Sequence, residues 1–146
     1  MKVLGSCSAE ETYDIARRLG EGAKEGDVVA LTGDLGTGKT VFAKGFAAGL
    51  GVKEHVSSPT YTIVQQYDDG RLPLYHFDVY RIGDISEMDE TGYDDCITGD
   101  GVTLIEWADM ISDIIPDSAI RVDIEKDITQ GTDYRRITID DEHTGD

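Results

Sequence analysis

Apolar and polar residues alternate along this chain with two different periods, one typical of helices and one of strands. Ser8 followed by Glu11 has the form of a capping box, and the apolar positions after it predict a helix over residues 9–19. Residues 28–31 are continuously apolar, which is typical of a strand covered on both faces of a parallel sheet. A glycine-rich turn follows, and the pattern then predicts a second helix over residues 39–50.

The second half of the chain favours strands. Two β-like runs, 61–67 and 72–77, are separated by a turn that contains Asp-Gly, which predicts a hairpin. A buried strand is predicted over residues 102–105, and alternating strands over 119–124 and 135–139. Short helical segments are expected between these strands, at 85–91 and 108–115.

The turn between the run at 28–31 and the helix at 39–50 carries a phosphate-binding pattern. It matches G-x-x-x-x-G-K-[ST] without a gap, in the residues Gly33, Asp34, Leu35, Gly36, Thr37, Gly38, Lys39 and Thr40. Glycines let the backbone approach closely, so that successive N–H groups and the helix start can cradle phosphate oxygens. Lys39 supplies charge to the outer phosphates, and the Thr40 hydroxyl suits magnesium. The pattern predicts a P-loop that binds ATP with Mg²⁺.

Two acidic residues follow apolar runs, so their carboxylates are expected at strand tips. Asp78 ends the run at 74–77, and Glu106 ends the run at 102–105. A P-loop site needs a carboxylate at a neighbouring strand end, to hold magnesium or orient water. We assign Glu106 to magnesium, directly or through water, and Asp78 to magnesium, the attacking water or a switch loop. The candidate catalytic residues are Lys39, Asp78 and Glu106, and the candidate metal ligands are Thr40, Asp78 and Glu106.

Five further residues near these motifs are interpreted from their residue types and positions. His76 is interpreted as a hydrogen-bonded packing residue within a strand. Trp107 is expected to pack near the nucleotide, at a protein interface or in the core. Arg81, Arg135 and Arg136 are interpreted as surface charges, with phosphate contact as the alternative.

These elements together predict the fold class and the domain organisation. We expect an α/β fold, with a mixed, mostly parallel central sheet, flanking helices and an antiparallel hairpin. The length of 146 residues suits a single P-loop ATPase domain over 1–146, with residues 141–146 as a flexible acidic tail.

The net charge of the chain limits the classes of partner that it can bind directly. The formal net charge is −17, and residues 68–146 hold 22 of the 30 acidic residues but 6 of the 13 basic ones. This disfavours direct nucleic-acid binding and anionic membrane surfaces. Because no apolar run approaches the roughly 20 residues of a membrane helix, and the start lacks a signal-peptide pattern, we expect a cytoplasmic protein.

Several segments, in this order and spacing, resemble one family. The chain is similar to TsaE (YjeE), the small P-loop ATPase of bacterial tRNA threonylcarbamoyladenosine biosynthesis. The segments that carry the resemblance are the P-loop at 33–40, Ser58-Pro59-Thr60-Tyr61-Thr62, His76-Phe77-Asp78-Val79-Tyr80-Arg81 and Leu104-Ile105-Glu106-Trp107. The resemblance runs from about Thr12 to Trp107 and thins beyond Pro116.

The resemblance implies an ATPase that works with two partner proteins, TsaB and TsaD, which install threonylcarbamoyl on the adenosine beside the anticodon of certain tRNAs. In that family the ATPase does not itself transfer the group, and its nucleotide cycle supports repeated turnover by the partners. The same likeness assigns Thr40 and Glu106 to magnesium and makes Asp78 an essential acid.

The resemblance also implies further contacts to the nucleotide. Thr60, within Ser58-Pro59-Thr60, falls in a nucleotide-sensing, switch-like loop. Residues 6–12 fall where the family closes over the base. Arg135 or Arg136 matches an arginine near the C-terminus.

Two other functions share the P-loop. A small-molecule kinase would need an acceptor pocket and a lid that carries arginines, and the chain is poor in basic residues. A non-catalytic interaction module would use ATP only to order the loop at 57–62. Phosphate transfer to a metabolite would favour the first. Partner function that survives loss of hydrolysis in Glu106→Gln would favour the second.

Overall fold

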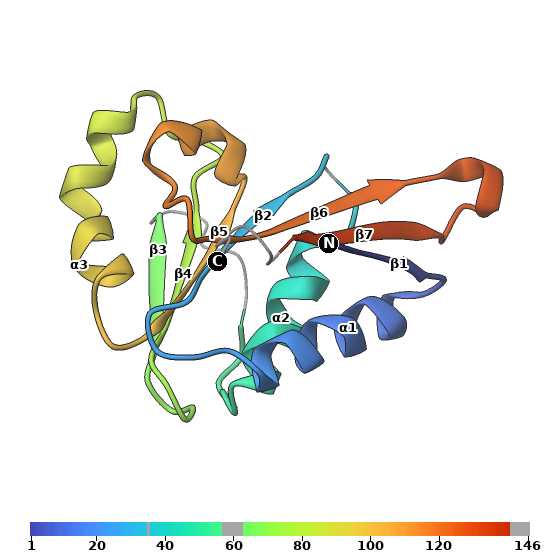
Figure 1. Cartoon of the computed structure of the whole chain (residues 1–146), viewed down its shortest axis with the longest axis horizontal. Helices are drawn as coiled ribbons and strands as arrows, with labels where there is room; N and C mark the ends of the chain where they lie inside the picture. The colour runs from blue at the N-terminus through green and yellow to red at the C-terminus, as the bar shows by residue number, and fades with distance from the viewer. Residues whose placement is uncertain (35, 57–62, 141–146) are drawn as a thin grey trace.

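The computed structural model describes residues 1–34, 36–56 and 63–140, and these form one seven-stranded sheet with helices on both faces (Figure 1). The strand order is β1-β7-β6-β2-β5-β4-β3. The elements in chain order are β1 (Lys2–Ser6), α1 (Ala9–Glu21), β2 (Val28–Thr32), α2 (Lys39–Gly49), β3 (Val64–Tyr67), β4 (Leu74–Asp78), η1 (Ile85–Thr91), α3 (Tyr93–Ile97), β5 (Val102–Glu106), η2 (Ala108–Ile114), β6 (Ile120–Lys126), η3 (Ile128–Gln130) and β7 (Arg135–Asp140).

The sheet is mixed, as the sequence predicted. Its four central strands, β6, β2, β5 and β4, pair in parallel. Antiparallel strands extend both edges, with β7 and β1 beyond β6 and with β3 beyond β4. The predicted hairpin is confirmed as the β3–β4 pair, although residues 61 and 62 lie outside the described part of the chain. Because β2, β4 and β5 run parallel to one another, their carboxyl ends lie together along one end of the sheet.

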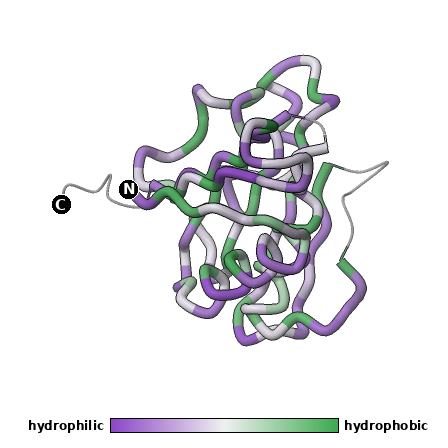
Figure 2. The backbone as a smooth tube through the Cα atoms, turned by 90° about the vertical axis from the view of Figure 1, so that its right-hand side faces the viewer, coloured by the Kyte–Doolittle hydropathy of each residue, from purple (hydrophilic) through white to green (hydrophobic). Residues whose placement is uncertain are grey.

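Two apolar clusters lie on opposite faces of the sheet. The cluster under α1 and α2 includes Leu31, Phe42, Phe46, Leu50, Leu74 and Leu104. The cluster under η1, α3 and η2 includes Phe77, Met88, Tyr93, Ile105 and Ile111. Figure 2 shows apolar stretches of the backbone alternating with hydrophilic ones along the chain. The continuous apolar run of β2 serves both clusters, because its residues point alternately to the two faces.

Helices α1 and α2 pack against each other through glycines. A Cβ added to Gly45 would lie 2.3 Å from the Tyr13 carbonyl oxygen, and one at Gly49 would lie 2.1 Å from the Arg17 oxygen. A Cβ at Gly20 would lie 2.2 Å from the Phe46 oxygen. Only a residue without a side chain allows this backbone approach. The contact fixes the axis of α2, the helix that begins at the P-loop lysine.

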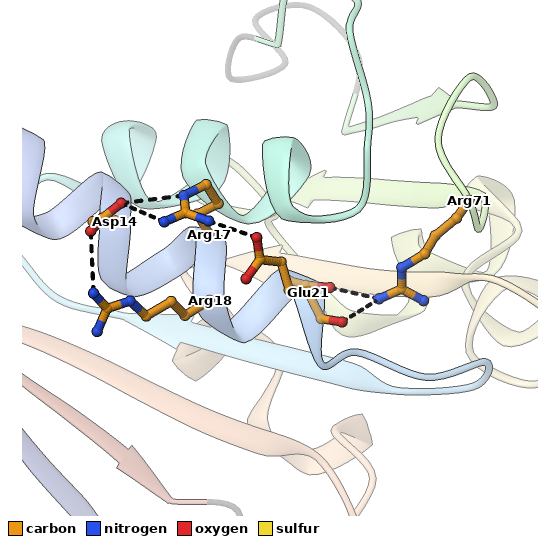
Figure 3. A network of polar contacts seen from close by, with 6 residues as sticks. Asp14, Arg17, Arg18, Glu21 and Arg71 are labelled. Carbon is orange, nitrogen blue, oxygen red and sulfur yellow. Dashed lines mark hydrogen bonds and ion pairs between the residues drawn. The ribbon is translucent and has the colours of Figure 1, made fainter.

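The exposed side of α1 carries a chain of ion pairs (Figure 3). Arg17 contacts Asp14 at 2.8 Å and Glu21 at 2.6 Å, and Arg18 contacts Asp14 at 3.5 Å. At the end of the helix, the Arg71 guanidinium donates to the carbonyl oxygens of Gly20, Glu21 and Ala23. Arg71 thereby donates to carbonyls at and just beyond the end of α1 and ties this helix to the β3–β4 turn.

The helix boundaries differ from the sequence predictions in instructive ways. Ser8 caps α1 by accepting from the Glu11 N–H at 3.1 Å, but the Glu11 carboxylate accepts from Cys7 instead of completing the box. The segments expected to be helical at 85–91 and 108–115 form 3₁₀ helices, and α3 was not predicted. A left-handed Gly92 separates η1 from α3. The predicted acidic tail at 141–146 lies outside the described residues, within which no helix is long and apolar enough to cross a membrane.

Candidate active site

The predicted P-loop joins the end of β2 to the start of α2. Its backbone is left-handed at Gly36, with φ of 77°, and at Gly38, with φ of 105°. These angles favour glycine, and a Cβ at Gly33 would lie 2.6 Å from the Ile124 carbonyl oxygen. Leu35, which the sequence included among the nucleotide-binding residues, lies outside the described residues.

Side chains from the loop and from β7 hold the turn in shape. The Thr37 hydroxyl donates to the Asp34 carbonyl oxygen at 2.8 Å. From β7, Arg135 Nε donates to the Thr37 carbonyl oxygen at 3.0 Å. A Cβ at Gly36 would lie 3.4 Å from Lys126 Nζ, so a second cation borders the loop. Three cations, Lys39, Arg135 and Lys126, therefore border the loop, and the charges of Asp34 and Glu106 lie close to Lys39 as well.

The P-loop lysine is enclosed by its own loop and by an aromatic ring. Lys39 Nζ donates to the carbonyl oxygens of Gly33, at 2.5 Å, and Asp34, at 2.7 Å. It also lies 4.0 Å from the centre of the Trp107 ring, within the range of a cation–π interaction. Burial lowers the pKa of Lys39, and the nearby charges of Glu106 and Asp34 oppose that shift. Binding a phosphate requires Lys39 to exchange these carbonyl contacts for phosphate oxygens.

The two predicted acids lie side by side at the tips of neighbouring strands. Asp78 on β4 is in register with Glu106 on β5, and Glu106 is in register with Leu31, just before the P-loop. Glu106 is 2% exposed. Burial raises the pKa of Asp78, and a hydrogen bond from the Tyr80 N–H to Asp78 opposes the shift. Strand register thus brings both carboxylates to the P-loop, as the sequence predicted.

His76 and Glu106 form a buried polar pair beneath these tips. His76 Nε2 lies 2.6 Å from Glu106 Oε2, and the histidine is fully buried. Among the described residues, His76 Nδ1 has no hydrogen-bond partner. The interpretation of His76 as a hydrogen-bonded packing residue is therefore incomplete, because its partner is a candidate metal ligand.

Trp107 follows Glu106 in a conformation that is rare for a residue with a side chain. Its φ of 62° is left-handed, and within the described part of the chain no other residue besides glycine has positive φ. The ring is half-buried and lies 4.6 Å, between centroids, from Tyr80. Such backbone strain is found where a site needs a side chain in a fixed place. The ring lies beside the P-loop lysine and also packs against the apolar cluster under η1, α3 and η2, and the expected contact with a nucleotide stays a prediction.

The remaining candidates divide between the site and the surface. Thr40 lies in the first turn of α2, next to Lys39. Arg135 contacts the loop, whereas Arg136 pairs with Glu125 at 3.6 Å and Arg81 is exposed. Thr60, with the rest of the Ser58-Pro59-Thr60 segment, lies outside the described residues. In the stretch 6–12, the buried hydroxyls of Ser6 and Thr12 hydrogen-bond each other at 2.7 Å.

The donor set at the strand tips fits one kind of cation. Across residues 1–34, 36–56 and 63–140, no three His, Cys, Asp or Glu residues cluster as a complete metal cage. Two carboxylates and the Thr40 hydroxyl border the P-loop instead. Mg²⁺ is commonly bound in this way, by one or two carboxylates together with substrate phosphates and water. The residues present therefore fit a magnesium ion that arrives with a nucleotide.

Comparison with known proteins agrees with this geometry. A family model described as "Threonylcarbamoyl adenosine biosynthesis protein TsaE" matches residues 6–137. The chain belongs to the TsaE family. The match includes residues beyond Pro116, where the sequence alone offered no distinctive motif, and so it takes in all of β6 and the first half of β7.

Individual TsaE relatives cover most of the chain. The tRNA threonylcarbamoyladenosine biosynthesis protein TsaE of Bacillus subtilis (strain 168) is 50% identical over 129 residues, which is 88% of this chain and 78% of that protein. The protein of the same name from Treponema pallidum (strain Nichols) is 40% identical, over 82% of this chain and 87% of its own length. The crystal structure of Bacillus subtilis YdiB superposes with a TM-score of 0.81 at 42% identity, covering 94% of this chain and 83% of that one.

The site contains residues whose place in it the sequence did not predict. His76 lies two residues before Asp78, so strand alternation puts both side chains on one face, and this was the available signal. No sequence pattern indicated that Lys126 lies near the P-loop, because its approach to Gly36 depends on the path of β6 beside the loop. The pairing of Tyr80 with Trp107 likewise needs the β4–β5 register.

Proposed function

We propose that this TsaE-family chain binds ATP with Mg²⁺ at the P-loop and hydrolyses it, in support of threonylcarbamoyl modification of the adenosine next to the anticodon in tRNA. The observation that carries the proposal is the convergence of Lys39, Asp78 and Glu106 at the carboxyl edge of the sheet. The biosynthetic role for which the relatives are named supplies the pathway. Residues 1–146 would act as a single P-loop ATPase domain.

The P-loop would hold the phosphates by backbone and charge. The N–H groups of the turn and the start of α2 offer donors to anionic oxygens, which accounts for Gly33, Gly36, Thr37 and Gly38. Lys39 would neutralise the outer phosphates. Leu35 and Thr60 remain proposed contacts on the strength of the family likeness alone.

Magnesium, when bound, would neutralise charge on the transferred phosphoryl group. Thr40 and Glu106 would hold the ion, and Asp78 would hold it with them or orient the attacking water. Phosphoryl transfer to water depends on positioning and electrostatic stabilisation, with little covalent chemistry for the protein to perform. A preorganised group of one lysine and two carboxylates, of which Lys39 and Glu106 are buried, would supply both.

Partner proteins would give the chain its link to tRNA. We propose that these are TsaB and TsaD, as the family resemblance implies. A net charge of −17 disfavours direct contact with tRNA phosphates, so a partner would carry the nucleic acid. A cytoplasmic location follows from that pathway.

One groove of the described part of the chain lies away from the P-loop. A groove of about 930 Å³ lies between α1 and strands β1, β6 and β7. Its lining includes Asp27 and Ser118, at the amino ends of β2 and β6, away from the P-loop at the carboxyl ends. This groove therefore does not offer an acceptor site beside the phosphates.

The decisive experiment measures ATP hydrolysis by the chain alone, by a TsaB–TsaD preparation alone, and by the mixture, with Mg²⁺ present. We expect turnover in the mixture to exceed the sum of the separate rates. Glu106→Gln should lower it by about 100-fold or more, the usual effect of removing one group that stabilises the transition state.

The matched control is Glu125→Gln, which makes the same chemical change at an exposed residue of β6 paired with Arg136. It should leave turnover unchanged. Turnover no higher than background in the mixture would reject the ATPase. A Glu106→Gln variant that has lost hydrolysis but still supports full tRNA modification would instead favour the non-catalytic module.

A further inference from the structure

We propose that His76 is a positioning residue that fixes the Glu106 carboxylate in the orientation used for the metal–nucleotide complex. This inference rests on the proposed function, because it concerns the same site. It assigns a role to a buried histidine that the P-loop chemistry itself does not use. The argument depends on the strand register, on the direction of one hydrogen bond and on the charge that surrounds Glu106.

Strand register places the histidine under the site. His76 pairs with Leu104 on β5 and with Gln65 on β3, and Asp78 pairs with Glu106 two positions later. Because side chains alternate along a strand, His76 and Asp78 share the sheet face that α2 covers. The ring is fully buried, so it holds a single place in the apolar cluster just below the carboxylate.

The hydrogen bond has a definite direction. If the single proton were on His76 Nδ1, a buried N–H would be left without a partner among the described residues, and the Nε2 lone pair would face a carboxylate that can only accept. The favoured tautomer therefore carries its proton on Nε2, and Nε2–H donates to Glu106 Oε2 at 2.6 Å. The carboxylate accepts this bond while it is ionised, which is the form that a metal requires.

A neutral donor suits this position better than a cation. Lys39 is close enough for its charge to interact with that of Glu106, so the carboxylate is drawn towards the ammonium. A tight Lys39–Glu106 pair would remove both groups from the phosphate and the metal. The imidazole holds Glu106 from below and leaves its negative charge intact, whereas an arginine there would neutralise it.

The test compares two substitutions of similar size. His76→Gln can still donate an N–H from the end of its side chain, and His76→Leu fills the space without a donor. Each full-length variant is titrated with Mn²⁺ in the presence of adenosine 5′-(β,γ-imido)triphosphate, and metal affinity is measured by electron paramagnetic resonance. Affinity for the same nucleotide in EDTA is measured separately.

We expect His76→Leu to weaken Mn²⁺ binding by about 10-fold or more, as is typical when the partner of a metal ligand is lost. His76→Gln should recover most of that loss, and nucleotide affinity in EDTA should stay within about 3-fold of wild type in both. Equal losses with and without metal would indicate a merely structural role and overturn the inference. So would full metal affinity in His76→Leu, or a glutamine variant as weak as the leucine one.

Two further results keep the inference distinguishable from the proposed function and independent of folding. If the wild-type protein binds no metal–nucleotide complex, both the proposed function and the inference about His76 are rejected. If His76→Leu does not fold, the ¹⁵N NMR spectrum of the wild-type imidazoles decides. We expect the His76 proton on Nε2, with a ¹⁵N shift that moves when Mg²⁺ and the nucleotide analogue are added. A proton on Nδ1, or a His76 signal that the complex leaves unmoved, would overturn the inference.

Discussion

The two layers that cover the sheet are built by different means. On one face, α1 and α2 are regular helices whose backbones touch through Gly20, Gly45 and Gly49. On the other face, η1, α3 and η2 are short and are held by individual side chains (Figure 1). Asp84 caps η1 with a full capping box, and the Tyr93 hydroxyl donates to the Ile114 carbonyl oxygen at 3.0 Å.

The candidate site lies where these two layers meet. The helical layer contributes the start of α2, with Lys39, and the other layer contributes Trp107 at the start of η2. Close helix packing resists deformation, whereas a layer of short turns has many low-cost rearrangements. We therefore expect the phosphate-binding side to be the more rigid one, and the layer of short helices that follows Trp107 to rearrange at lower cost.

The largest expected effect comes from breaking the helical layer. Gly45→Ala would place a Cβ 2.3 Å from the Tyr13 carbonyl oxygen and 3.0 Å from Ala16 Cβ, so the two helices must separate. We expect a loss of about 3 kcal/mol in the free energy of unfolding, measured by urea denaturation, because overpacking outweighs the gain in helix propensity.

The matched control is Gly22→Ala, at the end of the same helix pair. The nearest atom to its added Cβ is 3.8 Å away, and its φ of −92° suits any residue. It should change the free energy of unfolding by less than about 0.5 kcal/mol. Equal stability of the two variants would show that the glycine contact does not hold α2.

The next effect concerns the layer of short helices and appears only at high pH. Tyr93 is 1% exposed and stacks edge-to-face on Phe77 at 5.6 Å, and burial raises its pKa to about 12. Its unfolded pKa is about 10, so the contribution is complete below pH 10 and is lost as the pH rises through 12. A shift of this size corresponds to roughly 2–3 kcal/mol.

Comparison with Tyr93→Phe isolates this contribution. The variant lacks the ionisable hydroxyl, so its free energy of unfolding should fall less steeply than that of wild type between pH 10 and pH 12. Chemical denaturation at several pH values in that range measures the difference. Parallel curves for the two proteins would mean that the Tyr93 hydroxyl reaches solvent and that this layer is looser than its packing indicates.

Sequence reasoning succeeded where the pattern was local. The apolar run at 28–31 became β2 (Val28–Thr32), and the cap at Ser8 began α1 as expected. Asp78 and Glu106 were found because a carboxylate after an apolar run has one natural place, the strand tip. The predictions for Leu35 and Thr60 stay predictions, since neither residue is described.

What sequence reasoning missed depends on contacts between distant segments. Apolar periodicity predicted helical segments at η1 and η2 but does not distinguish a 3₁₀ helix from an α-helix. The role of Gly45 requires knowing that α1 crosses it, and the His76–Glu106 bond requires knowing that β4 lies beside β5. Trp107 has a left-handed backbone that its residue type disfavours, so no propensity would have indicated it.

The smallest expected effect arises at the junction of the layers, where function opposes stability. Burial raises the pKa of Asp78, so the ionised carboxylate carries a penalty in the folded protein. Asp78→Asn removes this penalty and keeps an oxygen to accept from the Tyr80 N–H. We expect the variant to be about 1 kcal/mol more stable than wild type at pH 7, while its ATP turnover is lost, as is common when a site residue is neutralised.

The pH dependence distinguishes this cause from a general gain in packing. A raised folded-state pKa means that the wild-type penalty is present at neutral pH and disappears as the pH falls through that pKa, because Asp78 then becomes protonated. The advantage of Asp78→Asn should therefore shrink in urea denaturation series taken from pH 7 to pH 4. An advantage that stays constant with pH would place its origin elsewhere. A variant less stable than wild type at pH 7 would mean that Lys39 and the Tyr80 N–H stabilise the charged carboxylate by more than its burial costs.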